Sequence, residues 1–116
     1  MDQLKSFNPE SLAELVELER DGSPGLIADL VGDYVVQSGP YLQSIDESAQ
    51  SGDFPTLERA AHSLKSSSRI LGLEITGWFC EKIEVAARGK SIDAGSISSL
   101  KSEIEGAISQ LRAFKP

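Results

Sequence analysis

The chain is poor in the residues that build disulfide frameworks, zinc sites and membrane spans. Its 116 residues include one cysteine and one histidine, which excludes an internal disulfide and a zinc site with several cysteines. Cys80 is therefore expected to be a small buried apolar residue. No apolar run approaches the roughly 18 residues of a membrane span, and the N-terminal stretch MDQLKSFNPE lacks the basic and apolar regions of an export signal. These absences predict a cytoplasmic protein with no membrane partner.

Positive charge is also scarce. There are 18 Asp and Glu residues against 11 Lys and Arg residues, which gives a net charge of −7. Because nucleic-acid binding depends on neutralising phosphates, this balance argues against a nucleic-acid partner. Hydrophobic residues make up 40% and charged residues 25% of the chain, as in ordinary soluble proteins. The length corresponds to about one domain, so we expect a single domain over residues 1–116, present as a monomer.

Proline and glycine divide the chain into segments with helical spacing, and no strand-like alternation competes with them. Signals that start a helix stand at Asn8-Pro9, Ser23-Pro24 and Asp53, and glycines that can end one stand at positions 22, 52, 72 and 89. Pro40 interrupts the segment that follows the start signal at Ser23-Pro24, which is either one kinked helix or two.

Two further helices are predicted in the C-terminal half. A stripe of apolar residues marks the first: Ile75, Phe79, Ile83 and Ala86. Spacings of three and four mark the last, from Ile97 to Phe114, as packing in a helical bundle requires. The predicted fold is therefore all-α: an antiparallel four-helix bundle with a short N-terminal helix capping one end.

The histidine lies in the stretch AAHSLKSSSRILG, residues 60–72. An α-helix turns about 100° per residue, so the leucines at positions 57, 64 and 71 form a seam opposite His62. Since those leucines must face the core, His62 must face solvent. Arg59, Lys65 and Arg69 lie on the side of His62, and no acid occurs between Arg59 and Arg69.

These surroundings suggest a chemical role for His62. Neighbouring cations disfavour the imidazolium form, and a neutral imidazole has a lone pair that can act as a nucleophile. The same cations would stabilise an anionic group on the ring, and the small Ser66 leaves the ring approachable. The spacing suits a phosphoryl acceptor, but by itself it leaves an ordinary solvated histidine open.

The stretch resembles the signature of histidine-containing phosphotransfer (Hpt) domains, H-x-x-K-G followed by small residues and a glycine. His62 matches the phosphoacceptor of that family and Lys65 matches its lysine, whereas Ser66 stands where the family usually has glycine. The resemblance covers roughly residues 26–88, and further matches occur at Gly52-Asp53, Ser67, Ser68, Leu71-Gly72 and Ile83-Glu84.

The resemblance implies a phosphorelay protein in which His62 takes a phosphoryl group from a receiver-domain aspartate and passes it on. Such a protein is a carrier rather than an enzyme. Its partners would be a response-regulator receiver domain, a hybrid sensor histidine kinase, or both. The receiver supplies the Mg²⁺, and we expect no cofactor or metal on this chain. The residues expected to bind the phosphoryl group or the partner are Lys65, Ser66, Arg69 and Arg59.

Other functions fit the sequence less well. No phosphate-binding G-x-x-x-x-G-K motif occurs, and His62 is not followed by the acid and proline of a kinase dimerisation helix. A serine hydrolase would need a hydroxyl beside the ring, and the adjacent Ser63 lies about 100° away around the helix. The remaining alternative is a helical docking module that binds a receiver or a kinase without carrying phosphate.

Overall fold

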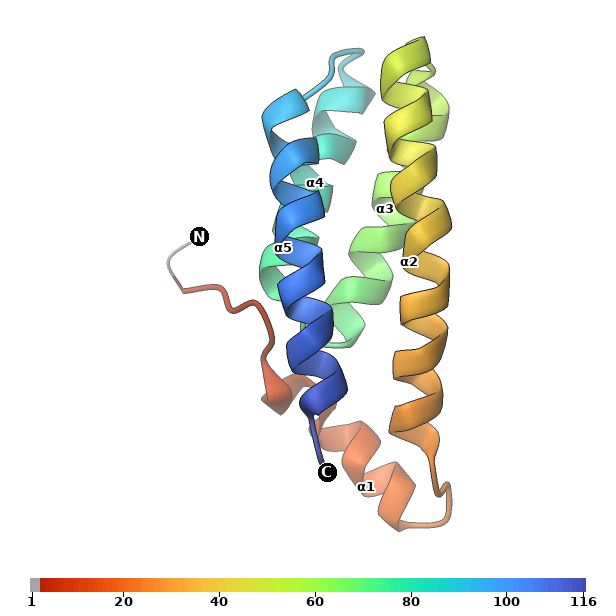
Figure 1. Cartoon of the computed structure of the whole chain (residues 1–116), viewed down its shortest axis with the longest axis vertical. Coiled ribbons are helices and arrows are strands. Elements are labelled where there is room, and N and C mark those ends of the chain that lie inside the picture. The colour runs from red at the N-terminus through yellow and green to blue at the C-terminus, as the bar shows by residue number, and fades with distance from the viewer. Residues whose placement is uncertain (1–2) are drawn as a thin grey trace.

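The computed structural model describes residues 3–116, which form one short 3₁₀-helix and five α-helices (Figure 1). In chain order these are η1 (Pro9–Leu12), α1 (Ala13–Arg20), α2 (Leu26–Ser51), α3 (Phe54–Ile70), α4 (Glu74–Arg88) and α5 (Ala94–Ala113). No strand occurs within residues 3–116, so the predicted all-α class is confirmed. Residues 1 and 2, which belong to the predicted domain and to the stretch without an export signal, lie outside the described residues.

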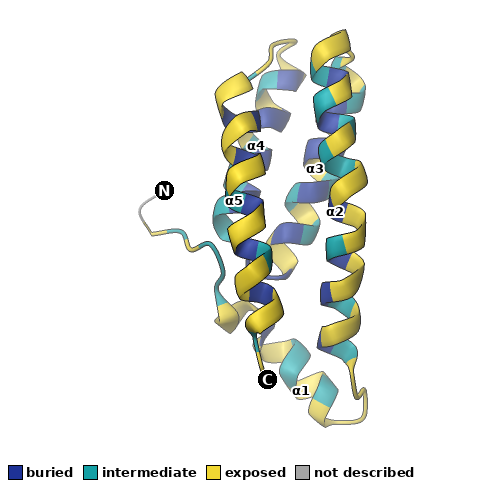
Figure 2. Ribbon diagram, viewed as in Figure 1, coloured by how far each residue is buried: buried dark blue, intermediate teal, exposed yellow. Residues whose placement is uncertain are grey.

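The four longer helices lie side by side along the longest axis of the molecule (Figure 1). α3 packs against both α2 and α4, and α5 packs against α4 and α2. The buried faces of the helices meet between them, while the outward faces are exposed (Figure 2). η1 and α1 lie at one end, near the C-terminus (Figure 1).

α3, the helix of His62, is fixed in position by its start and by its buried seam. Gly52 takes the left-handed conformation (φ 73°) that ends α2. The Asp53 carboxylate then accepts hydrogen bonds from the backbone N–H of Thr56 at 3.3 Å and from its hydroxyl at 2.6 Å, which caps α3. Leu57 and Leu64 are fully buried. The predicted inward seam is therefore confirmed.

The turn from α3 to α4 is held by the N-terminal segment. Gly72 has φ 81°, and a Cβ atom at this position would lie 2.4 Å from the carbonyl oxygen of Asn8, so no other residue fits. The backbone N–H of Asn8 donates to the carbonyl of Gly72 at 2.8 Å. Glu74 accepts hydrogen bonds from the Lys5 backbone N–H and from the Asn8 side chain. These contacts fix where α4 begins relative to α3.

Pro40 does not divide α2, which continues through it as one helix. Proline cannot donate to the carbonyl four residues earlier, which belongs to Val36. Val36 is 75% exposed, so solvent can satisfy that carbonyl. The exposed position of the missing hydrogen bond explains why the helix tolerates proline here.

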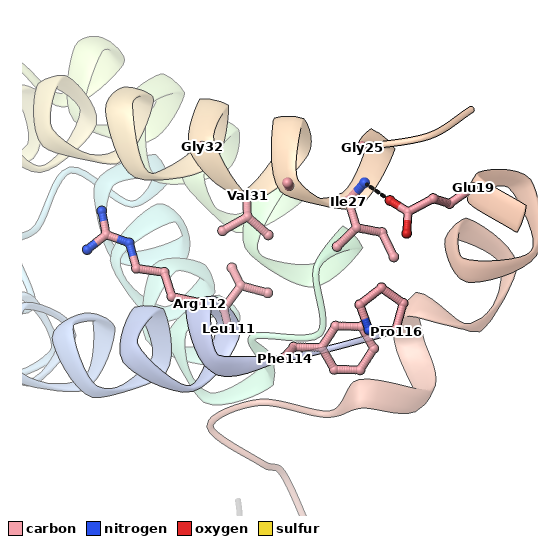
Figure 3. A pocket seen from close by; sticks show the side chains of 10 residues that line it. Glu19, Gly25, Ile27, Val31, Gly32, Leu111, Arg112, Phe114 and Pro116 are labelled. Carbon is pink, nitrogen blue, oxygen red and sulfur yellow. Dashed lines mark hydrogen bonds between the residues drawn. The ribbon is translucent and has the colours of Figure 1, made fainter. Parts of the chain in front are cut away.

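Two details of the predicted helices are wrong. α2 begins at Leu26 after Gly25 rather than at Ser23-Pro24, and the Glu19 carboxylate of α1 accepts the backbone N–H of Ile27 at 3.0 Å (Figure 3). Gly25 has no side chain that could cap α2, and Glu19 supplies this hydrogen bond instead.

The buried face of α4 consists of Thr76, Gly77, Cys80, Ile83, Glu84 and Ala87. This face does not coincide with the predicted stripe. Three residues of that stripe, Ile75, Phe79 and Ala86, are only half-buried.

The orientation of α3 gives a test of the fold. Replacing the fully buried Leu64 with alanine should lower the free energy of unfolding by about 2–5 kcal/mol, because it leaves a cavity in the core. Ser66→Ala, on the exposed side of the same helix, should change it by less than about 0.5 kcal/mol. Chemical denaturation of both variants would measure these changes, and the reverse ranking would contradict the orientation of α3.

Candidate functional site

His62 projects from the outward side of α3, and 58% of its side chain is exposed. This confirms the predicted exposure. The ring is not free, however, because Nδ1 lies 2.7 Å from Oε2 of Glu84 on α4. One edge of the imidazole is therefore attached to the neighbouring helix, and the rest of the ring is open to solvent.

Glu84 is an acid on the buried face of α4, and only 5% of its side chain is exposed. Its Oε1 accepts a hydrogen bond from Lys65 Nζ at 2.5 Å, and its Oε2 accepts one from Arg88 Nη2 at 3.1 Å. Burial acts to raise the pKa of Glu84, but the hydrogen bonds from Lys65 and His62 outweigh it and hold the pKa below its ordinary value. Glu84 is therefore ionised at neutral pH.

The contact with Glu84 determines which nitrogen of His62 can react. An ionised carboxylate only accepts hydrogen bonds, so Nδ1 must carry the proton that it shares with Glu84. In the neutral ring the lone pair is then on Nε2. A histidine oriented by a carboxylate through one nitrogen is ready to act as a nucleophile through the other. The arrangement presents Nε2 as the reactive atom.

The structure adds an acid from another helix to the predicted surroundings of the ring. Arg59, Lys65 and Arg69 were expected beside His62, but the group in contact with the ring is Glu84 of α4. Lys65 is not a free cation at the rim: its side chain is only 14% exposed and is paired with Glu84. The carboxylate was missed because it comes from another helix, 22 residues along the chain.

The other predicted residues lie on two sides of His62. Arg59 lines a hollow of about 420 Å³ together with Glu58, His62, Ser63, Glu84 and Arg88. Arg69 lies outside that hollow, and its guanidinium is 3.4 Å from Glu81 of α4. Ser66 is exposed and also lies outside the hollow. The structure thus brings Arg59 beside the histidine, while Arg69 is directed toward Glu81.

Arg88 is a further residue of the site that the sequence did not predict. Its Nε donates to Glu58 Oε2 at 3.0 Å, while its Nη2 donates to Glu84. Arg88 therefore connects an acid one turn before His62 to the acid that holds the ring. One signal was available in the sequence: Glu84 lies four residues after Cys80 and three before Ala87, which places it on the same helix face as two small apolar residues, and an acid on a buried face needs a partner.

The arrangement does not match a metal site or a serine hydrolase. Within residues 3–116, no group of three His, Cys, Asp or Glu side chains could hold a metal ion. In the same range, the hydrogen bond of His62 is to Glu84, and no serine or threonine hydroxyl is paired with the ring. None of the described helices has the length and hydropathy that crossing a membrane requires.

Comparisons with known proteins show the family and the fold of the chain. The sequence profile of the Hpt domain matches residues 29–114. The crystal structure of histidine-containing phosphotransfer protein B (HptB) from Pseudomonas aeruginosa PAO1 is similar, with a TM-score of 0.81. That similarity covers 92% of this chain and 91% of the other, at 24% sequence identity. No curated protein sequence matches the chain.

The lowered pKa of Glu84 gives a pH-dependent test. Because the pKa is lower in the folded chain than the value of about 4.3 expected when unfolded, the ionised carboxylate stabilises the fold above that pH. This stabilisation is lost as the pH falls through the folded value. Glu84→Gln should lower the free energy of unfolding by about 1–3 kcal/mol at neutral pH, and the difference from the wild type should shrink below about pH 4.

Denaturation at a series of pH values would measure this difference. Glu81→Gln is a matched control, because Glu81 also pairs with Lys65 and Arg69 but is 47% exposed. It should have a small effect at every pH. A loss for Glu84→Gln that stayed constant from neutral to acidic pH would show that the charge of Glu84 does not contribute.

Proposed function

Because the chain belongs to the family of histidine-containing phosphotransfer (Hpt) domains, we propose that it carries a phosphoryl group on His62 in a two-component phosphorelay. The family is one of phosphoryl carriers rather than enzymes. The observation that carries the assignment to His62 is the hydrogen bond of Nδ1 to the buried Glu84. It leaves the lone pair of Nε2 on an imidazole whose side chain is 58% exposed.

The proposed reaction is a transfer between a receiver aspartate and Nε2. The lone pair of Nε2 forms the N–P bond while the bond from phosphorus to the aspartyl oxygen breaks, and the aspartate leaves as a carboxylate. The proton on Nδ1 stays in place, so the phosphorylated ring becomes cationic. Glu84 lies against that proton and stabilises the positive charge. In the reverse transfer the ring leaves as a neutral imidazole, which is a better leaving group than an anionic one.

The partner supplies what this chain does not hold. The proposed partners are a response-regulator receiver domain and a hybrid sensor histidine kinase, with Mg²⁺ bound by the receiver rather than by this chain. Positioning and charge neutralisation are the main requirements of phosphoryl transfer. We propose that this takes place in the cytoplasm, between the receiver and a monomer in which residues 1–116 form one domain, an antiparallel four-helix bundle.

The residues around His62 then have distinct proposed roles. Arg59 and Arg69 supply positive charge to an acidic receiver site, and Ser66 keeps the approach to the ring open because it is small. Lys65 acts at the phosphoryl site through Glu84, to which it is paired. The docking contact should be small and transient, with less than about 1,200 Å² of total buried surface.

The chemical nature of the modified residue tests this function. After incubation with a phosphorylated receiver domain and Mg²⁺, the chain should acquire label that is lost in acid and retained in alkali, as expected for an N–P bond. His62→Gln should remain unlabelled, because His62 is the one histidine in the chain.

His62→Gln, like Ser66→Ala, should also keep its free energy of unfolding within about 0.5 kcal/mol of the wild-type value, because the position is exposed and the glutamine amide can donate to Glu84 in place of the ring. A folded His62→Gln protein that still acquires full label would contradict the assignment. A wild-type chain that binds the receiver but stays unlabelled would instead identify a docking module.

A further inference from the structure

Arg88 occupies an unusual position beside the proposed phosphoryl site. Its guanidinium contacts two carboxylates at once, Glu58 of α3 at 3.0 Å and Glu84 of α4 at 3.1 Å. The oxygen of Glu84 that accepts Arg88 is the same Oε2 that accepts Nδ1 of His62. Arg88 is therefore separated from the imidazole by a single carboxylate oxygen.

The hollow beside His62 is lined by Arg88, a cation whose ion pair with Glu58 is exposed. Glu58, Glu84 and Arg88 all line it with the ring. The ion pair of Arg88 with Glu58 is exposed, with 59% and 36% of the two side chains accessible, and exposed pairs of this kind are weak. Lys65, by contrast, is largely buried against Glu84. Of these two cations bonded to Glu84, Arg88 is the one that can change partners at little cost.

A phosphoryl group on Nε2 would compete for this guanidinium. It carries more negative charge than a carboxylate and offers three acceptor oxygens, and an arginine fork suits two of them at once. Glu58 lies one turn before His62, on the same side of α3, so its charge would also repel the arriving group.

We propose that Arg88 and Glu58 form an exchangeable ion pair that responds to phosphorylation of His62. This inference rests on the proposed function. In the unmodified chain, Glu58 takes the place of the phosphoryl group and holds Arg88 beside the ring. In the phosphorylated chain, Arg88 turns from Glu58 to the phosphoryl oxygens, and Glu58 is released to solvent. The two states then present different charges on the surface next to His62, which a partner can distinguish.

A titration of the phosphoryl group tests this exchange without any receiver. The whole chain can be phosphorylated chemically with potassium phosphoramidate, in which Nε2 displaces ammonia from phosphorus. The pH dependence of the phosphorus NMR signal then reports the proton affinity of the phosphoryl group. Arg88→Ala should raise this affinity about threefold, because a cation that favours the dianion is lost. Arg88→Lys should recover part of the change.

Glu58→Gln should have the opposite effect and lower the proton affinity, because Arg88 is no longer held by a competing carboxylate and a nearby negative charge is removed. In the Arg88→Ala background, the effect of Glu58→Gln should become smaller, because only the direct repulsion remains. The matched control is Arg69→Ala, which removes another exposed arginine paired with an acid of α4 but lies outside the hollow. It should leave the proton affinity nearly unchanged.

Equal proton affinities in the wild type and in Arg88→Ala would overturn the proposal. So would an Arg69→Ala effect as large as that of Arg88→Ala, because the charge would then act at a distance rather than by contact. These outcomes are separate from failure of the proposed function, which is judged by transfer from a receiver. If His62 took up no phosphoryl group even from phosphoramidate, both proposals would fall.

Discussion

Glu84 places an ionised carboxylate at the interface of α3 and α4, where only 5% of its side chain reaches solvent. A charge in that position must be compensated, and the structure does so with Lys65 on one oxygen and with His62 and Arg88 on the other. Each of these contacts has a second consequence. Lys65 is largely buried, the imidazole is fixed in one tautomer, and Arg88 is held in the lining of the hollow beside His62. The properties of the candidate site thus follow from the charge of one acid.

The fold keeps the acid and the histidine in register. α3 is positioned by the Asp53 cap at one end and by the Gly72 turn at the other. Between this cap and this turn, the buried leucines determine which side of α3 faces solvent. The contacts of the N-terminal segment with Gly72 and Glu74 set the start of α4. The fold and the chemistry are connected through this turn, because a rotation of α4 would separate Glu84 from the ring.

Much of this could be predicted from local sequence patterns. The leucine seam of α3 and the turn residues are local signals, so the order of the helices and the exposure of His62 were predicted correctly, whereas the start of α2 was not. Glu84, Arg88 and the buried state of Lys65 were not, because they depend on which residues of α4 face α3. The predicted stripe of α4 was displaced from its true buried face. Apolar spacing alone did not identify a face that includes a glycine, a threonine and an acid.

Phosphorylation at Nε2 depends on the tautomer of His62, which nitrogen NMR of the labelled imidazole measures directly. In its neutral form, the imidazole of the unmodified chain should show a proton on Nδ1 and none on Nε2. After phosphorylation, the coupling to phosphorus should appear at Nε2, with the proton still on Nδ1. Glu84→Gln should allow the other tautomer, because an amide can donate to Nδ1 as well as accept from it. A proton on Nε2 in the wild type, or phosphorus bound to Nδ1, would contradict the proposed role of Glu84 in presenting Nε2.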